Sequence, residues 1–402
     1  MGIETELQAQ VDAQLMEQGA FAPLDLLFNS GRLFYSDYEA WRRREIAVLD
    51  EVLMGDRANI VAEMERAVSY ARSIGLVEQP QEFSAWGTAG ASGPALRVSG
   101  DAKLHKLVGT RYLPAQNAPQ MDLFFDNPVV ALTNGIARSL SARNALESQR
   151  QLDRLYVQAP NHSDLAAFDQ LVRGLDDLSR PVEDPAGRLE FLTAIGPTAR
   201  HLLGSSGSRD YLSPLWRQLA DSLNGRPYSA DQPDLHRSFA LSQAQDWTGV
   251  SESVVAEGEW WLHAPLCLRL TESSFRRRRR IEALTAWCHL CWLAPAEAAA
   301  GVARLRQTDL SGLWQAFNEA DEEEGLAAEE FPAWLLLHEP GLARQLSVDL
   351  PRGTSPAEEN YRCVHRWIHA HRMHQRDEEM ALRKQLQQSH PVLFGVLKRT
   401  VG

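Results

Sequence analysis

The chain has 402 residues, and 44% of them are hydrophobic, so it contains enough apolar material to bury a core in two or three domains or in one repeat array. Its 41 Lys and Arg face 53 Asp and Glu, and the resulting net charge of −12 repels a phosphate backbone unless basic residues gather on one face. Four cysteines are too few for a disulfide framework, and we expect a cytoplasmic protein without a secretion signal or a membrane span.

Residues 1–80 are predicted to form an N-terminal helical region. Apolar residues recur every three or four positions in "IETELQAQVDAQLMEQ", "YSDYEAWRRREIAVLDEVLM" and "RANIVAEMERAVSYARSIGL", as they do on one face of a helix. Ser36 is placed to cap the second of these helices, with Glu39 following it, and Gly75 is placed to end the third. The second helix would present one broad apolar face, formed by Tyr38, Trp41, Ile46 and Leu49.

Residues 81–126 are predicted to be an irregular connector with a short strand around residues 96–98. The segment is rich in Gly and Ser and then in Pro, Gln and Asn, so it sustains neither a helical period nor a long strand alternation. Long loops inside a folded chain often carry function, and this connector is therefore one candidate partner surface. A phosphate-binding loop is disfavoured, because no Gly-Lys-Ser/Thr follows the glycines Gly87, Gly90 and Gly93.

The rest of the chain is predicted to be nearly all helix. Helical periodicity is strong in residues 127–200, is interrupted in a loop-rich segment at 201–235, and is strong again in residues 236–345. Residues 346–402 are predicted to hold a linker and one long helix, 357–388, before a short tail.

Two segments share one plan. "SARNALESQRQLDRLYVQAPNH" (141–162) and "RRRRIEALTAWCHLCWLAPAEA" (277–298) each consist of a polar turn, an amphipathic helix and an Ala-Pro stop. This plan resembles the second half of a tetratricopeptide (TPR) repeat, and a shift by that family's period, about 34 residues, places a third turn before Trp247. The family's leucine, small residue, aromatic and closing proline correspond to Leu270, Ala283, Trp287 and Pro295, and more loosely to Leu132, Ser148, Leu152 and Pro160.

The resemblance covers about 120 residues and implies an all-α fold. The implied architecture is an α-solenoid of helical hairpins, with the N-terminal helical region before it and a C-terminal capping helix after it. Stacked hairpins share a continuous core and present an extended groove, so the resemblance implies a non-enzymatic scaffold or adaptor that binds a peptide or protein. The candidate groove residues on first helices are Asn134, Arg138, Arg269 and Glu272.

Five consecutive arginines precede the helix of the later copy. We expect them at the tight turn between the paired helices, because inside a helix some of these side chains would be driven into the core. An acidic protein is the expected partner of this turn. An RNA-associated repeat protein is an alternative, and its binding would fall steeply with salt. The five residues are Arg276, Arg277, Arg278, Arg279 and Arg280.

Cysteine and histidine clusters offer a second alternative. Cys288 and Cys291 have the spacing of a zinc site, but their flanks are helical and apolar, so we predict buried, unreactive thiols. The segment 361–374 concentrates histidines, and a metal ion could bind His365 and His369, which are one helical turn apart. A metal-dependent protein or enzyme centred on this helix is thus the rival function, whereas the scaffold needs no cofactor.

Overall fold

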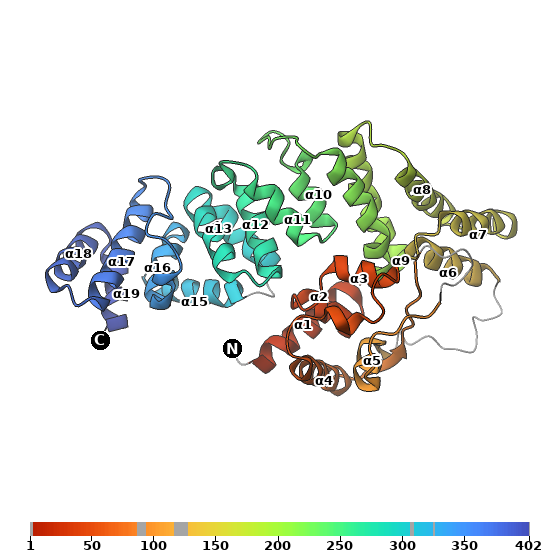
Figure 1. Ribbon diagram of the computed structural model, residues 1–402, viewed down its shortest axis with the longest axis horizontal. Helices are drawn as coiled ribbons and strands as arrows, with labels where there is room; N and C mark the ends of the chain where they lie inside the picture. Colours follow the sequence, from red (N-terminus) through yellow and green to blue (C-terminus); the bar gives the residue numbers. More distant parts are fainter. Residues whose placement is uncertain (1–2, 87–93, 116–127, 306–308, 325, 402) are drawn as a thin grey trace. The chain divides into compact units, whose positions relative to one another are not determined.

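The structure is a computed structural model that describes residues 3–86, 94–115, 128–305, 309–324 and 326–401. Most of these residues are in α-helices, as predicted, and helices that follow one another in the chain pack against each other in pairs (Figure 1). The chain divides into two compact units, Met1–Asp246 and Trp247–Gly402.

The first unit begins with helices around an aromatic core. Tyr38, Trp41 and Leu49 are buried in one cluster with Met64, so the apolar face predicted for this region does form a core. The helix carrying it is shorter than predicted, because the chain leaves the helical conformation at Arg44, where φ is 66°. Its N-cap is Phe34 and not Ser36. The helices are α1 (Ile3–Gln18), α2 (Pro23–Asn29), α3 (Tyr35–Arg42), the 3-10 helix η1 (Leu49–Val52) and α4 (Arg57–Ser73).

A small antiparallel sheet follows α4. Gly75 ends the helix with a φ of 84°, as predicted, and the next residues form strand β1 (Leu76–Pro80). Strand β2 (Thr110–Pro114) pairs with β1 so that Leu76 lies opposite Pro114, and α5 (Ala102–Val108) connects the two strands. The prediction of helix up to residue 80 was therefore wrong for the last five residues, which find hydrogen-bond partners far along the chain.

The predicted connector contains more structure than its composition indicated. Its described part, residues 81–86 and 94–115, holds α5 and β2 and an isolated bridge between Ser84 and Ala95, whereas residues 96–98 form no strand. The glycines at 87, 90 and 93 and the segment 116–127 lie outside the described residues.

The rest of the first unit is helical. The prediction of a loop-rich segment at 201–235 was wrong for residues 201–222, which belong to the long helix α9. Gly204 interrupts α9 with φ 69° and ψ 175°, a backbone conformation that glycine adopts readily because it has no Cβ. The helix therefore kinks there. The elements are α6 (Pro128–Ser141), α7 (Ala145–Gln158), α8 (Leu165–Asp176), η3 (Asp177–Ser179), α9 (Pro185–Ser222), η4 (Pro233–Leu235) and α10 (Arg237–Gln243).

The second unit begins with a helix, a single 3-10 turn and a helical hairpin. In the hairpin α12 packs along α13, and α11 packs against α12. These elements are α11 (Trp247–Val255), η5 (Trp260–Leu262), α12 (Ala264–Arg276), α13 (Arg280–Leu293), α14 (Pro295–Gly301) and η6 (Val302–Leu305).

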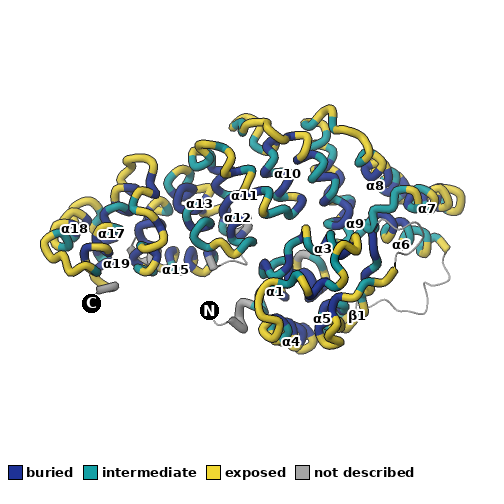
Figure 2. Tube along the Cα trace, in the orientation of Figure 1, coloured by how far each residue is buried: buried dark blue, intermediate teal, exposed yellow. Residues whose placement is uncertain are grey.

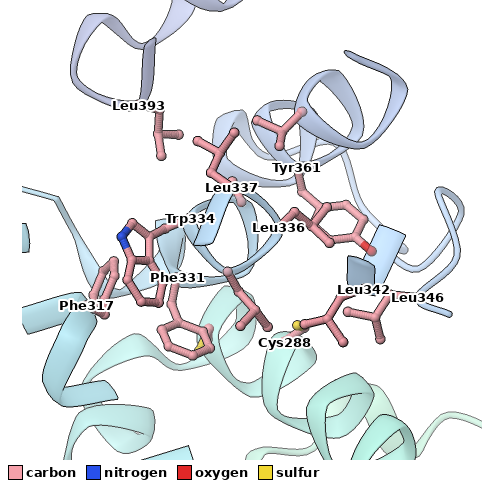
Figure 3. Close-up of a cluster of buried hydrophobic side chains, with 14 of the residues drawn as sticks. Cys288, Phe317, Phe331, Trp334, Leu336, Leu337, Leu342, Leu346, Tyr361 and Leu393 are labelled. Atoms are coloured by element: carbon pink, nitrogen blue, oxygen red, sulfur yellow. The ribbon is translucent and has the colours of Figure 1, made fainter. Parts of the chain in front are cut away.

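Its second half surrounds one large apolar cluster. Figure 3 shows Cys288 pointing toward Leu342 among side chains that include Phe331, Trp334 and Tyr361. The single helix predicted at 357–388 was wrong, because the chain turns at His374, where φ is 57°. The elements are α15 (Asp309–Glu324), η7 (Ala328–Glu330), α16 (Phe331–His338), η8 (Pro340–Arg344), α17 (Pro356–Arg372), α18 (Arg376–Ser389) and α19 (Pro391–Val401).

Candidate interaction surfaces

Three helical hairpins, α6/α7, α12/α13 and α17/α18, make their turns in the same way. The residue after each C-cap has a left-handed backbone, with φ of 59° at Arg143, 58° at Arg278 and 57° at His374. The next residue then donates its N–H to the carbonyl five residues earlier, as Arg279 does to Ser274 at 2.8 Å. This bond closes the end of the first helix and directs the chain back along it. Its counterparts join Asn144 to Ser139 and Gln375 to Ala370, both at 2.9 Å.

The second helices of these hairpins also agree in length and in how they end. The helices α7, α13 and α18 each have 14 residues. The C-cap residue of each helix precedes a proline, and proline disfavours helical backbone in the residue before it. The φ of these residues is −142° at Ala159, −148° at Ala294 and −150° at His390. The two predicted copies thus form the same kind of hairpin. The α17/α18 hairpin was missed as a further copy because His390 stands before its proline, where the other two have alanine.

The 34-residue shift also predicted a turn before Trp247, and the structure has one. Gln245 there has a φ of 59°, and its neighbour Asp246 donates its N–H to the carbonyl of Leu241 at 3.0 Å. The following helix, α11, has only nine residues. This segment therefore shares the turn of the three hairpins but not their 14-residue second helix.

The five arginines lie at the turn of the α12/α13 hairpin, as predicted. Arg276 ends α12 and Arg280 begins α13, so Arg277 to Arg279 form the connection, and the side chains of Arg278 and Arg279 are exposed. The two outer arginines are engaged within the unit. The guanidinium carbon of Arg276 is 5.7 Å from the ring centroid of Trp247, and Arg280 Nη2 donates to both carboxylate oxygens of Glu339 at 2.9 and 3.0 Å.

A second basic turn lies against the same short segment. Arg372, the last residue of α17, donates from Nη2 to the carbonyl of Pro340 at 2.6 Å, directly beside the Glu339 that Arg280 contacts. The turns 276–280 and 372–376 therefore meet at Glu339–Pro340, and we call these two turns the basic edge. The exposed cationic or titratable residues that it presents are Arg278, Arg279, His374 and Arg376.

The four predicted groove residues lie on first helices, as expected. Asn134 and Arg138 are exposed on α6, where Arg138 Nε donates to the carbonyl of Asn134 at 3.3 Å. Arg269 and Glu272 are half-buried on α12. The first pair belongs to the first unit and the second pair to the second unit, and their role in binding stays a prediction.

The cysteines are buried, as predicted. Cys288 and Cys291 have no exposed surface and lie in the apolar cluster of the second unit. Burial raises the pKa of both thiols, and it raises the pKa of Cys267 to about 12 and that of Cys363 to about 11. Reactive cysteines and metal-binding cysteines act as thiolates. These four side chains are held as neutral thiols that fill the core.

The histidines of α17 point in different directions. His365 is half-buried, and its Nε2 is 2.9 Å from the carbonyl oxygen of Leu346. His369 is exposed, and His371 Nδ1 lies 3.2 Å from Glu379 Oε1. Within residues that the structure describes, no three His, Cys, Asp or Glu side chains are grouped so that they could hold a metal ion.

A buried charge network in the first unit was missed by sequence reasoning. Asp210 of α9 is only 4% exposed, and it accepts hydrogen bonds from Tyr35 at 2.9 Å and from Tyr38 at 3.3 Å. Arg42 Nη1 lies 3.2 Å from Asp210 Oδ2, and Arg143 Nε donates to the Asp210 carbonyl at 2.8 Å. We call these residues and their ion-pair partners, listed next, the Asp210 network. The partners are Asp25, Glu39, Arg209 and Arg217.

The network perturbs the protonation of its own members. Burial raises the pKa of Tyr35 and Tyr38, the latter to about 12, and the charge of Asp210 adds to this effect. Burial also lowers the pKa of Arg143, while Tyr35 and Asp210 offset it in part. No local motif could reveal this network, because Tyr35 and Asp210 are 175 residues apart. Its buried and hydrogen-bonded groups give it a structural role, namely joining α3 to α9 and to the α6/α7 turn.

A pocket of about 580 Å³ at the start of α9 is a further concave feature of the first unit. Arg188 forms part of its wall and is fixed from three sides. It donates to Gln218 Oε1 at 3.0 Å, lies 3.4 Å from Asp177 Oδ2, and has its guanidinium carbon 5.3 Å from the ring centroid of Phe191. Burial lowers the pKa of Arg188, and Asp177 opposes this. The pocket also contains Arg180, Glu183 and Asp184, so it mixes both signs of charge.

Fold and surfaces together define a largely helical protein built from sequentially packed helix pairs. Across the parts of the chain that the structure describes, no helix is long and apolar enough to cross a membrane. No protein-family model, no curated protein and no solved structure matches the chain.

Proposed function

We propose that this protein is a non-enzymatic scaffold, built from TPR-like hairpins in solenoid fashion, that binds an acidic segment of a partner protein through the basic edge. The repeated hairpin supports the architecture. Three copies share the left-handed turn residue, the 14-residue second helix and the proline that follows it. Such repeats stack through their faces and leave their turns at one border, where loops commonly serve binding.

The observation that carries the proposal is the meeting of two basic turns at Glu339–Pro340. Arg280 and Arg372 anchor these turns, and Arg278, Arg279 and His374 between the helix ends are exposed. Guanidinium groups form charge-assisted hydrogen bonds with carboxylates, as Arg280 already does from Nη2 to Glu339. An acidic peptide segment would offer the same contact to Arg278 and Arg279. The anchoring arginines hold the edge in place for this contact.

A protein partner fits this edge better than RNA does. Binding of single-stranded RNA relies on aromatic platforms for base stacking as well as on positive charge. Trp287, an aromatic of the adjacent helix, is fully buried, and the ring of Trp247 already faces Arg276. The chain also carries a net charge of −12, which repels a long polyanion more strongly than a short acidic peptide.

Fluorescence anisotropy with a labelled 12-residue peptide rich in glutamate tests the proposal. We expect the full-length protein to bind the peptide, with affinity falling as salt is raised. The variant Arg277→Ser/Arg278→Ser/Arg279→Ser should bind roughly tenfold or more weakly, because it removes all three charges of the connection, including the two exposed guanidinium groups, whose ion pairs are worth up to about 1 kcal/mol each. Arg276 and Arg280 are retained because they contact Trp247 and Glu339.

The matched control is Arg66→Ser/Arg173→Ser/Arg200→Ser, which removes the same charge from exposed positions of the first unit. It should bind the peptide like the wild type. Equal losses in both triple variants would show a general charge effect and overturn the proposal. So would tighter binding of a 12-nucleotide single-stranded RNA than of the peptide. Co-purification of the tagged protein from its native host, with the turn variant alongside, would then identify the partner.

A further inference from the structure

The three hairpins expose the same face of their second helix to three different environments. In each of α7, α13 and α18 this face contains positions 2, 6, 9 and 13, which fall within about 60° of one another around a helix axis. The equal lengths and equal turns of the hairpins make these positions equivalent. The residues are Leu146, Arg150, Asp153 and Val157 in α7; Ile281, Thr285, Cys288 and Trp292 in α13; and Asp377, Ala381, Lys384 and Gln388 in α18.

The face of α13 is covered from within its own unit. Cys288 has no exposed surface, and the ring centroid of Trp292 is 5.3 Å from that of Tyr361 in α17. Ile281 packs against the same apolar cluster. An apolar second helix in this fold therefore receives another helix on this face.

The face of α18 is uncovered but polar. Asp377, Lys384 and Gln388 are exposed, and the only apolar position of the four is a small alanine, Ala381. A repeat protein needs such a polar outer face where its stack of helices ends, because the face then meets water.

The face of α7 is uncovered, and it carries an aliphatic side chain at each end with two charged side chains between them. Leu146 is 63% exposed and Val157 is 83% exposed. They are eleven residues apart, which is about three helical turns. Figure 2 shows that α7 includes exposed stretches. A shallow pocket of about 260 Å³, lined by Asp153, Arg154, Val157 and Gln158, opens beside it. The face of α7 thus combines two large exposed aliphatic side chains, which the terminal face of α18 lacks, with two charged side chains, Arg150 and Asp153.

The two charges on the α7 face, Arg150 and Asp153, are complementary to those of a second copy of the same face. When two copies of α7 are placed antiparallel about a two-fold axis, residues whose numbers sum to 303 lie opposite each other. Leu146 then meets Val157 of the second copy, and Arg150 meets Asp153 of the second copy, and both contacts occur twice, as symmetry requires. The pocket beside Val157 can receive the second copy's Leu146, in the manner of a knob entering a hole.

We propose that α7 is a homodimerisation surface, on which the Leu146, Arg150, Asp153 and Val157 face of one chain pairs antiparallel with the same face of a second copy. The interaction is weak. A 14-residue helix is about 21 Å long, and one helix pair buries less than the roughly 800 Å² per partner of a standard stable interface. The dimer therefore forms reversibly with rising protein concentration.

Sedimentation velocity and light scattering on the full-length protein, from about 10 to 500 µM, test the proposal. We expect the mass to rise from 45.0 kDa toward twice that value. Leu146→Glu/Val157→Glu should stay at the monomer mass across this range, with an unchanged circular dichroism spectrum because both side chains are exposed. The matched control, Ala381→Glu/Gln388→Glu on the equivalent face of α18, should associate like the wild type.

A charge exchange tests the register of the two helices. Arg150→Glu places a carboxylate opposite the second copy's Asp153, and Asp153→Arg places a guanidinium opposite the second copy's Arg150, so each variant alone should dimerise at least fivefold more weakly. In a mixture of the two variants both cross-pairs have opposite charges, and the mixed dimer should form at about the wild-type affinity. Arg150→Glu/Asp153→Arg in one chain should also restore self-association.

Three results would overturn the proposal. One is a monomer at every concentration. Another is a dimer that the Leu146→Glu/Val157→Glu variant leaves unchanged, because that dimer would use a different surface. The third is a mixture of the two charge variants that associates no better than either variant alone. Binding of a different protein to α7 by a monomeric chain would count as the first of these results.

Discussion

The interiors of the two units are stabilised by different kinds of interaction. In the first unit the Asp210 network adds buried, hydrogen-bonded charges to an aromatic core, whereas the second unit packs around one large apolar cluster of aromatic and leucine side chains. Apolar burial is non-directional and tolerates repacking. A buried charge instead needs an oppositely charged or hydrogen-bonding partner, because burial of an unpaired charge costs several kcal/mol of folding free energy. The first unit should therefore be sensitive to single polar substitutions, and the second to changes of side-chain volume.

The largest effect is expected for Asp210→Ala. The substitution leaves Arg42 buried without its carboxylate partner and Arg209 with Asp25 alone, and this should lower the free energy of unfolding of the first unit by about 3–5 kcal/mol. Hydrogen exchange with mass spectrometry at increasing urea concentrations would follow the two units separately. The exposed Asp231→Ala is the control and should change stability by less than about 0.5 kcal/mol. Equal protection of α3 and α9 in variant and wild type would contradict a structural role for the network.

Leu290→Ala probes the second unit in the same way. Leu290 is fully buried in the apolar cluster, so its removal creates a cavity and should cost about 2–4 kcal/mol. Leu290→Met keeps nearly the same volume and should cost less than about 1.5 kcal/mol. Urea unfolding monitored by tryptophan fluorescence would give both values. If the two substitutions were equally damaging, the cluster would be less tolerant of repacking than the comparison requires.

Glu330 is a buried carboxyl of the second unit, and its raised pKa should give this unit a distinct pH dependence. Burial raises the pKa of Glu330 from 4.5 to about 7, although Asn360 donates a hydrogen bond to it at 3.0 Å and His390 lies 3.6 Å away. A carboxyl with a raised pKa binds its proton more tightly in the folded chain. Its stabilising contribution is therefore complete below pH 4.5 and is lost as the pH rises through about 7.

Glu330→Gln should remove this contribution. Between about pH 4.5 and 7 the difference in unfolding free energy, wild type minus variant, should fall by up to about 1.4 kcal/mol per pH unit, and it should be constant above that range. Burial lowers the pKa of His289 to about 4, so the contribution of this residue to stability is lost as the pH falls. His289 is present in both proteins, and its contribution therefore cancels in the difference. The exposed Glu297→Gln should show a constant difference. A difference that rises with pH would contradict the raised pKa of Glu330.

How much the sequence could predict follows from the range of the interactions involved. The turn at Arg276–Arg280 and the stop at Pro295 depend on a few adjacent residues, and periodicity and proline placement were enough to predict both. Strand β1 was taken for helix because its partner β2 lies about 30 residues further on. The helix break at His374 gave no signal, because neither Gly nor Pro occurs there. The basic edge itself depends on Arg372 reaching Pro340, a contact between separate hairpins that spacing alone could not indicate.

The turn residues give the smallest and most selective test of the difference between the units. Arg143 and Arg278 have nearly the same left-handed φ, 59° and 58°, and glycine adopts this conformation without the steric cost that other residues incur. Arg278 is exposed, so Arg278→Gly should raise the free energy of unfolding of the second unit by about 0.5–1 kcal/mol.

Arg143→Gly should lower the free energy of unfolding of the first unit, although it relieves the same steric cost of a left-handed backbone. Its side chain donates to the Asp210 carbonyl and to Glu39, and its guanidinium carbon lies 3.8 Å from the ring centroid of Trp86. Loss of these contacts leaves Glu39 with fewer partners in a buried site and outweighs the relief of the turn. Urea unfolding of the two variants gives the comparison directly. Stabilisation by both glycines would show that the Asp210 network contributes little, because the two turns would then differ only in side chains that do not matter.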